Sequence, residues 1–295
     1  MSKNIINGYE IVAPWECCGN GRYSFAKKNG ENFFIKELKS PRYPVSGSEA
    51  IRRERIKLCE EFEKSRREVM EALRKVALPN GNILYPIELF RDGAFYYEVS
   101  YKAEGERLEC SNIGRCTKEM KVMLFKTIMA SLKLLEQAGI VYGDMKPENI
   151  QVVYNPSINS LRGQIYDLTD SYIEKKPGKR DEVIGTTPYY SPELGKYIVE
   201  NRKFDILNLG EKRITTKNDI FAAAIVMHMY FTGGRMPAIP DKYNYIYESV
   251  LDNCEPVIDE SIDEDIAFIL RAMLSKKSAD RPNAEKILEL LNRAA

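Results

Sequence analysis

Residues 48–78 contain neither glycine nor proline, and this run limits the folds that are open to the chain. Glu, Arg, Lys, Leu and Ala dominate it, and all of these residues favour helix. The run therefore predicts at least one long helix, which the turn-forming sequence LPNGN ends. Strand-like segments lie on both sides: YEIVAPWEC and ENFFIKEL before it, and ILYPIELF and GAFYYEVSY after it. Together these segments predict a small antiparallel sheet with one main helix.

The pattern becomes mostly helical in the second part of the chain. Residues 117–138 have the apolar spacing of an amphipathic helix, and Gly139 is a typical residue to end it. Residues 220–231, IFAAAIVMHMYF, are almost entirely apolar but too short to span a bilayer, so they predict a buried helix. The polar residues 200–219 predict a surface loop.

Charge and cysteine content argue against several classes of function. The formal net charge is +1, so no charge excess points to nucleic acid or an anionic membrane as a partner. The 6 cysteines form no CxxC pair and the only histidine is His228, which argues against a zinc site and against Ser-His or Cys-His hydrolases. We expect free thiols in a reducing cytoplasm, and we expect His228 to be a packing residue. The start, MSKNIINGYE, lacks the apolar core of a signal peptide.

The sequence VYGDMKPENIQVVY, residues 141–154, carries three polar groups at a spacing suited to phosphoryl transfer. A carboxylate such as that of Asp144 accepts or orients the proton of an attacking hydroxyl. Lys146 points to the same side in an extended segment, where it neutralises phosphate charge. The amide oxygen of Asn149 is a hard ligand suited to Mg²⁺. Taken alone, the D-x-K-P motif fits a solvated turn equally well.

Further motifs accompany this loop in a fixed order. GNGRYSFA and FFIKEL precede it, and IYDLTD, GTTPYYSPE, NDIFAAAIVM and ADRPNAEKIL follow it. In this order the motifs resemble the Ser/Thr branch of the eukaryotic-like protein kinase family, from about Tyr9 to about Leu291. The resemblance implies an α+β, bilobal protein-kinase-like fold, with a small N-lobe, residues 1–102, and a larger, mostly helical C-lobe, residues 103–295. It also implies ATP as the nucleotide, Mg²⁺ as the metal, and a protein with Ser or Thr as the substrate.

The resemblance assigns chemical roles residue by residue. Asp144 falls at the catalytic aspartate, Lys146 at the lysine that contacts the transferring phosphate, and Asn149 at the second metal ligand. Asp167 falls at the main Mg²⁺ ligand. It is preferred to Asp170 because it follows two apolar residues, as a residue at a strand exit should.

Nucleotide-binding positions are implied in the same way. Lys36 falls at the strand lysine that holds the α- and β-phosphates, and such a lysine needs a carboxylate partner. Glu68 is preferred for this role because REVMEAL resembles the family's helix pattern, whereas Glu71 fits if the loop after the helix has no insertion. The other implied nucleotide positions are Gly19, Gly21, Phe34, Ser100, Tyr101 and Gln151.

Four further residues are implied to support the site. Thr186 is expected to bond the catalytic aspartate and lysine, and Asp219 is expected to anchor the backbone of the catalytic loop. Glu193 is expected to form a buried ion pair with Arg281.

Several positions depart from the family pattern. Gly143 stands where an arginine usually pairs with a phosphate on the activation loop, so we expect activity without such phosphorylation. Thr169 replaces the glycine of the usual DFG motif, and Ser24 replaces the third glycine of the nucleotide-covering loop. Phe34 replaces an alanine above the adenine, and Gln151 replaces an apolar residue below it. An active kinase is the leading hypothesis, and a pseudokinase that acts as a binding or scaffold module is the alternative.

Overall fold

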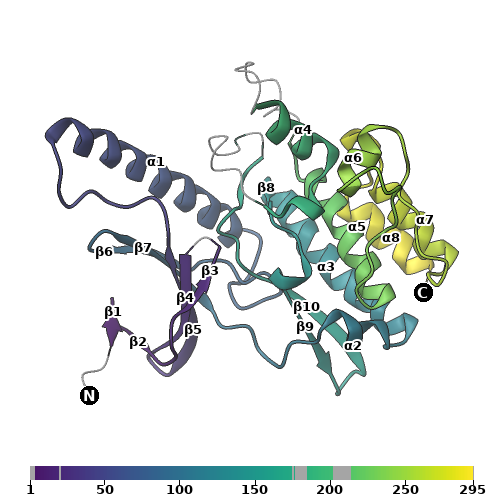
Figure 1. The fold of residues 1–295 in the computed structure, drawn as a ribbon. Helices are drawn as coiled ribbons and strands as arrows, with labels where there is room; N and C mark the ends of the chain where they lie inside the picture. The colour runs from purple at the N-terminus through teal and green to yellow at the C-terminus, as the bar shows by residue number, and fades with distance from the viewer. Residues whose placement is uncertain (1–3, 20, 175, 177–184, 202–213, 295) are drawn as a thin grey trace. The chain divides into compact units, whose positions relative to one another are not determined.

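The computed structural model describes residues 4–19, 21–174, 176, 185–201 and 214–294. The chain divides into two compact units, Met1–Glu104 and Gly105–Ala295. The first unit holds an antiparallel sheet with one long helix, and the second is mostly helical (Figure 1). These are the two parts of the α+β fold that the motifs predict.

The sheet of the first unit is antiparallel, in the order β1-β2-β4-β5-β7-β6, with β3 paired to β4. The small antiparallel sheet expected around the long helix is therefore present. The strands are β1 Ile5–Ile6, β2 Tyr9–Ile11, β3 Glu16–Cys18, β4 Gly21–Lys28, β5 Glu31–Leu38, β6 Glu88–Asp92 and β7 Phe95–Tyr101.

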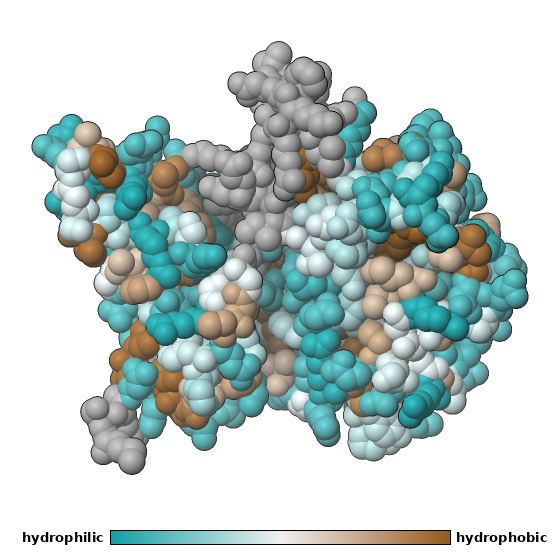
Figure 2. Space-filling view, in the orientation of Figure 1, coloured by the Kyte–Doolittle hydropathy of each residue, from teal (hydrophilic) through white to brown (hydrophobic). Residues whose placement is uncertain are grey.

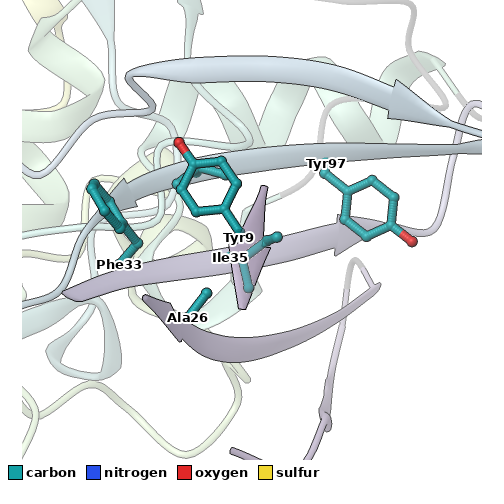
Figure 3. Packing of buried hydrophobic residues seen from close by; sticks show 6 residues of the cluster. Tyr9, Ala26, Phe33, Ile35 and Tyr97 are labelled. Atoms are coloured by element: carbon teal, nitrogen blue, oxygen red, sulfur yellow. The ribbon is translucent and has the colours of Figure 1, made fainter. Parts of the chain in front are cut away.

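One face of this sheet carries a core of buried hydrophobic residues. Tyr9 packs edge-on against Phe33, with ring centroids 5.3 Å apart. Because side chains alternate along a strand, the β5 residues Phe34 and Lys36 lie on the opposite face. The core residues, most of which Figure 3 labels, are Tyr9, Ala26, Phe33, Ile35, Tyr97 and Val99.

The opposite face packs against α1, Glu49–Arg74. Cys59 and Met70 of the helix are buried with Leu38 of β5 and Tyr96 of β7. The helix predicted from residues 48–78 is thus confirmed, and it ends shortly before the LPNGN turn. Its N-terminal part, residues 49–58, is exposed at nearly every position, so packing holds the C-terminal part of the helix.

The second unit contains two small sheets and a set of helices. β9, Ile150–Asn155, and β10, Ser160–Ile165, form an antiparallel hairpin, and β8, Ile140–Val141, pairs with β11, Tyr172–Ile173. The helices are α2 Cys110–Gly114, α3 Lys118–Ala138, α4 Pro192–Asn201, α5 Lys217–Thr232, α6 Ile246–Leu251, α7 Glu264–Met273 and α8 Ala284–Arg293.

Two helices of this unit confirm sequence expectations. Thr117 caps the N-terminus of α3 by accepting the Met120 N–H, and Gly139 ends the helix at φ 63. α5 is buried on nearly all sides, as its apolar sequence predicts. Its His228 is 1% exposed, and its Nε2 accepts the Asp259 N–H at 3.1 Å, which leaves Nδ1–H to donate to Arg235 O at 2.8 Å. His228 is therefore a packing residue.

The surface agrees with the composition. Hydrophilic residues occupy most of the face shown in Figure 2, and hydrophobic residues lie there in small separate groups. None of the helices in the described ranges has the length and apolar character needed to cross a bilayer. All six cysteines are free thiols. Most of the surface loop predicted over residues 200–219 lies outside the described residues.

Candidate active site

The loop between β8 and β9 carries the three polar residues of the D-x-K-P-x-N motif, Asp144, Lys146 and Asn149. A 3₁₀ turn over Pro147–Asn149 folds the chain back, and proline suits this turn because its φ is fixed and its missing N–H is not needed there. The turn brings the Asn149 side chain next to Asp144. The Asn149 Nδ2 group donates to the Asp144 carbonyl and to Asp144 Oδ2, each at 2.9 Å.

Asp144 is the centre of a hydrogen-bonded cluster. Its Oδ1 accepts from Thr186 Oγ1 at 2.7 Å, and its Oδ2 lies 2.7 Å from Lys146 Nζ. Lys146 Nζ also donates to Thr186 Oγ1, at 2.8 Å. The Asp144 side chain is 10% exposed and that of Lys146 is 22% exposed, so both retain some access to solvent. The cluster fixes the direction of the carboxylate, and it confirms the contacts expected of Thr186.

Asp219, at the start of α5, holds the backbone of this loop. Its Oδ2 accepts the Tyr142 N–H at 2.7 Å, and its Oδ1 accepts the Gly143 N–H at 3.0 Å. Burial raises the pKa of Asp219 to about 7, although the two backbone N–H groups act to lower it. The anchoring role expected of Asp219 is confirmed.

Gly143 has a backbone that favours glycine. Its φ is 87, and a Cβ atom there would lie 3.0 Å from the Asp170 carbonyl oxygen. The family pattern has an arginine at this position. With the left-handed backbone found at residue 143, an arginine there would be strained.

Tyr142 supports the site in a way that sequence reasoning missed. It is fully buried, and its hydroxyl donates to the Tyr166 carbonyl oxygen. Burial raises the pKa of this hydroxyl well above its usual value, so it remains a donor. The only signal in the sequence was a tyrosine at the end of an apolar strand.

Asp167 follows β10, as its expected place at a strand exit requires. The register of the hairpin pairs Ile150 with Ile165, and the Tyr166 N–H donates to the Asn149 carbonyl at 3.1 Å. Asn149 and Asp167 therefore lie at the same end of the hairpin. Asp167 has φ 56, a conformation that costs a non-glycine residue about 1–3 kcal/mol and often occurs at functional sites. Thr169 Oγ1 donates to Asp167 Oδ1 at 2.8 Å.

The donor set of Asn149 and Asp167 fits Mg²⁺. The Asn149 amide nitrogen donates to Asp144, which leaves the amide oxygen as its ligating atom. Mg²⁺ prefers carboxylate and carbonyl oxygens, and it commonly takes one or two protein ligands together with phosphates and water. Within the described ranges no group of three or more His, Cys, Asp or Glu side chains is suited to a metal. A Mg²⁺ ion whose other ligands are phosphate oxygens and water molecules does not need such a group.

Arg107 supports the loop through hydrogen bonds to two of its carbonyl groups. Arg107 donates from Nη2 to Pro147 O at 2.9 Å and from Nη1 to Glu148 O at 3.1 Å. Sequence reasoning missed it, because contacts to carbonyl groups leave no pattern in the sequence. Gln151 has the partner that its amide needs, since its Nε2 donates to Gly105 O at 2.9 Å.

The ion pair expected between Glu193 and Arg281 is confirmed. Nη1 and Nη2 of Arg281 donate to Oε1 and Oε2 of Glu193 at 2.6 and 2.7 Å. The arginine side chain is 0% exposed and the glutamate side chain 10% exposed. This two-point contact ties α4 to the segment before α8.

In the first unit, Lys36 lies on the sheet face that α1 covers. It is 3% exposed, and the register of β5 and β7 places it opposite Glu98. Glu68 is half-buried and Glu71 is exposed, and the choice between them as partner of Lys36 stays a prediction. The charged residue of α1 that is buried is Arg66, which sequence reasoning did not consider.

Aromatic rings occupy the same face near Lys36. Phe34 stacks on Tyr23 with ring centroids 5.1 Å apart, and it meets Phe25 at 6.2 Å. Across the strands Phe34 lies opposite Ser100, so a large side chain is paired with a small one. Phe34 is half-buried within this group.

The two glycines of the glycine-containing turn differ in how much room their backbone leaves for a side chain. Gly21 has φ 149, and a Cβ atom there would lie 2.0 Å from the Glu37 carbonyl oxygen, so glycine is required. Gly19 is exposed, with no atom within 4 Å of a Cβ position. Ser24 is 1% exposed, and its Oγ donates to Ala13 O at 2.7 Å on the core face. Tyr101 also turns its ring to that face, 5.3 Å from Phe33.

Comparison with known proteins shows which family this chain resembles. The sequence pattern described as "Protein kinase domain" matches residues 24–290. The plant Serine/threonine-protein kinase PEPKR2 of Arabidopsis thaliana is 22% identical over 275 residues, which cover 92% of this chain and 49% of that protein. Serine/threonine-protein kinase dkf-2 of Caenorhabditis briggsae is 23% identical over 210 residues, covering 68% of this chain and 16% of that protein. Serine/threonine-protein kinase nekl-2 of Caenorhabditis elegans is 25% identical over 167 residues, covering 56% and 41%.

These curated relatives are all longer than the region they share with this chain, which spans about half of PEPKR2 and less of the other two. The family match, in contrast, covers most of the chain and includes every motif of the site from Lys36 to Arg281. The chain therefore belongs to the protein kinase family, in the eukaryotic-like Ser/Thr group that its motifs resemble.

Proposed function

We propose that this chain transfers the terminal phosphoryl group of ATP to Ser or Thr hydroxyls of a protein substrate, with Mg²⁺ bound by Asn149 and Asp167. The observation that carries the proposal is the cluster at Asp144, in which Thr186 and Lys146 hold the carboxylate at hydrogen-bond distance. A carboxylate held in this way is suited to orient a hydroxyl and accept its proton. The names of the relatives support Ser/Thr specificity.

Each residue has a defined part in this reaction. Asp144 orients the attacking hydroxyl and takes its proton. Lys146 and Lys36 neutralise phosphate charge, Lys146 at the transferring group and Lys36 at the α- and β-phosphates. The bound metal supplies charge neutralisation at the phosphates. Thr186 and Asn149 keep the Asp144 carboxylate in one direction, so the cost of orienting it is met before substrate binds.

The direct test is phosphorylation of a generic protein acceptor by purified protein with labelled ATP and Mg²⁺, beside the Asp144→Asn variant. We expect transfer to Ser and Thr, and a rate about 10²–10⁴-fold lower in the variant, because an amide cannot take the proton. Transfer that is equal in the two proteins would contradict the assignment of Asp144.

A pseudokinase is the second candidate, and the ring of Phe34 favours it. That ring and its neighbours Tyr23 and Phe25 occupy the face of the sheet that carries Lys36. A thermal-shift measurement separates the two candidates, because Mg-ATP at about a hundred times its dissociation constant stabilises a binding protein by about 2.7 kcal/mol. An unchanged melting temperature would favour the pseudokinase.

We further propose that activity does not depend on phosphorylation of the activation loop. Gly143 lacks the side chain that pairs with such a phosphate, and its positive φ disfavours a replacement that has one. Phosphatase treatment is expected to leave the rate unchanged, and a large loss of activity would contradict the proposal.

A further inference from the structure

The buried side of α1 contains one charged residue among apolar ones. Cys59, Val69, Met70 and Leu73 are buried there, and so is Arg66. Arg66 Nε donates to Glu98 Oε1 at 2.7 Å, and both side chains are only 4% exposed. The helix is therefore joined to strand β7 by a buried ion pair.

The same carboxylate is the cross-strand neighbour of Lys36. The register of β5 and β7 places Lys36 directly opposite Glu98, and residues that face each other in this way have Cβ atoms about 4.5–5.5 Å apart. Both side chains emerge on the α1 face, and Lys36 is 3% exposed. Glu98 thus lies on this face together with two cations, Arg66 from the helix and Lys36 from the sheet.

We infer that Glu98 is the positioning residue for Lys36, and that Arg66 fixes Glu98 in turn. This assignment replaces a helix glutamate, the role foreseen for Glu68 or Glu71, and it rests on the proposed ATP-dependent function. Lysine is a compact charge on a flexible stem, so it needs a fixed partner to point at phosphates. A glutamate on a central strand, itself held by the planar arginine group, provides a rigid one.

Stability alone does not account for the presence of this pair. Apolar residues of similar volume often replace a buried ion pair without loss of stability. The pair does, however, link α1 to Lys36: Arg66 of the helix contacts Glu98 of the sheet, and Glu98 lies opposite Lys36. Under this inference, displacement of α1 disturbs phosphate binding by way of Arg66 and Glu98.

The test uses the whole chain with both charges removed, Arg66→Met with Glu98→Leu, because a single removal would leave one charge buried without its partner. Circular dichroism and thermal melting check the fold. Dissociation constants are then measured for Mg-ATP and for adenosine, which has no phosphates for Lys36 to contact. We expect affinity for Mg-ATP to fall about 10- to 100-fold, as when other outer-shell partners of a ligand-binding group are removed, with affinity for adenosine unchanged.

A second variant, Glu98→Asp, keeps the charge and withdraws it by one methylene group. It is expected to fold and to show a smaller loss for Mg-ATP, again with adenosine binding unchanged. Glu60→Gln, on the exposed side of α1, is the matched control and should bind both ligands as the natural protein does.

Three results would overturn the inference. Equal loss for Mg-ATP and adenosine would show that the pair is only structural. Unchanged Mg-ATP affinity in both Glu98 variants, with a loss in Glu68→Gln, would restore the helix glutamate as partner of Lys36. Failure of the natural protein to bind Mg-ATP at all would remove the proposed function itself, and the inference with it.

Discussion

Removing the hydroxyl of Thr186 tests whether the cluster at Asp144 acts in catalysis. Thr186 Oγ1 donates to Asp144 Oδ1 at 2.7 Å and accepts from Lys146 Nζ at 2.8 Å. Thr186→Val keeps the β-branched shape and removes both bonds. A hydrogen bond to a charged group contributes about 1.5–3 kcal/mol. At about 1.36 kcal/mol for each factor of ten in rate, loss of one such contribution in the transition state lowers kcat about 10- to 150-fold.

The assay is steady-state phosphorylation of a protein acceptor, with kcat and KM for ATP determined separately. We expect the loss in kcat, with KM for ATP little changed, because the hydrogen bonds of Thr186 are made to Asp144 and Lys146, the proposed catalytic groups. Thr187→Val is the matched control, since it makes the same chemical change one residue away. Thr186→Ser keeps the hydroxyl and should recover most of the rate. A Thr186→Val enzyme as fast as the natural one would refute the reasoning.

Three further predictions concern stability. Glu193→Gln breaks a buried ion pair on one side and should lower the free energy of unfolding by about 3–5 kcal/mol in urea denaturation. Arg281→Met should cost more, because the Arg281 guanidinium also donates to the carbonyl oxygens of Lys217, Ser275 and Lys276, and an Arg281→Met variant more stable than Glu193→Gln would contradict the account. Gly143→Ala should cost about 1–2 kcal/mol because its φ is 87, and an unchanged melting temperature would count against the strain argument. Burial lowers the pKa of His228 below its usual 6.5, so the folded chain resists protonation and the histidine's contribution to stability is lost as pH falls below about 6.5. Denaturation from pH 5 to 8 of the natural protein and of His228→Gln isolates this contribution as the difference between the two curves, and a constant difference would contradict it.

Local patterns predicted the elements that depend on local physics. The glycine-free run gave α1 and the apolar spacing before Gly139 gave α3. The order of motifs singled out Asp144, Lys146 and Asn149, which the structure brings into contact. The contacts of Thr186 and Asp219 were also foreseen, because the family pattern fixes their sequence positions.

The residues that sequence reasoning missed depend on register and packing. Whether Arg66 or Glu68 points inward is decided by how α1 is rotated on the sheet, and spacing along one helix does not fix that rotation. The pairing of Lys36 with Glu98 requires the register of two strands that are far apart in the sequence. Ser24 sits where a motif has glycine, yet strand alternation turns it to the core face.

The β9–β10 hairpin has a consequence for protein engineering. Its base sets the separation of Asn149 and Asp167. Its tip, residues 156–159, is exposed and lies at the opposite end of the paired strands from these two residues. A few added residues at the tip lengthen a turn without shifting the paired register below it. Ser157 is therefore a suitable point at which to insert an affinity tag or a fluorophore while the proposed metal ligands keep their spacing.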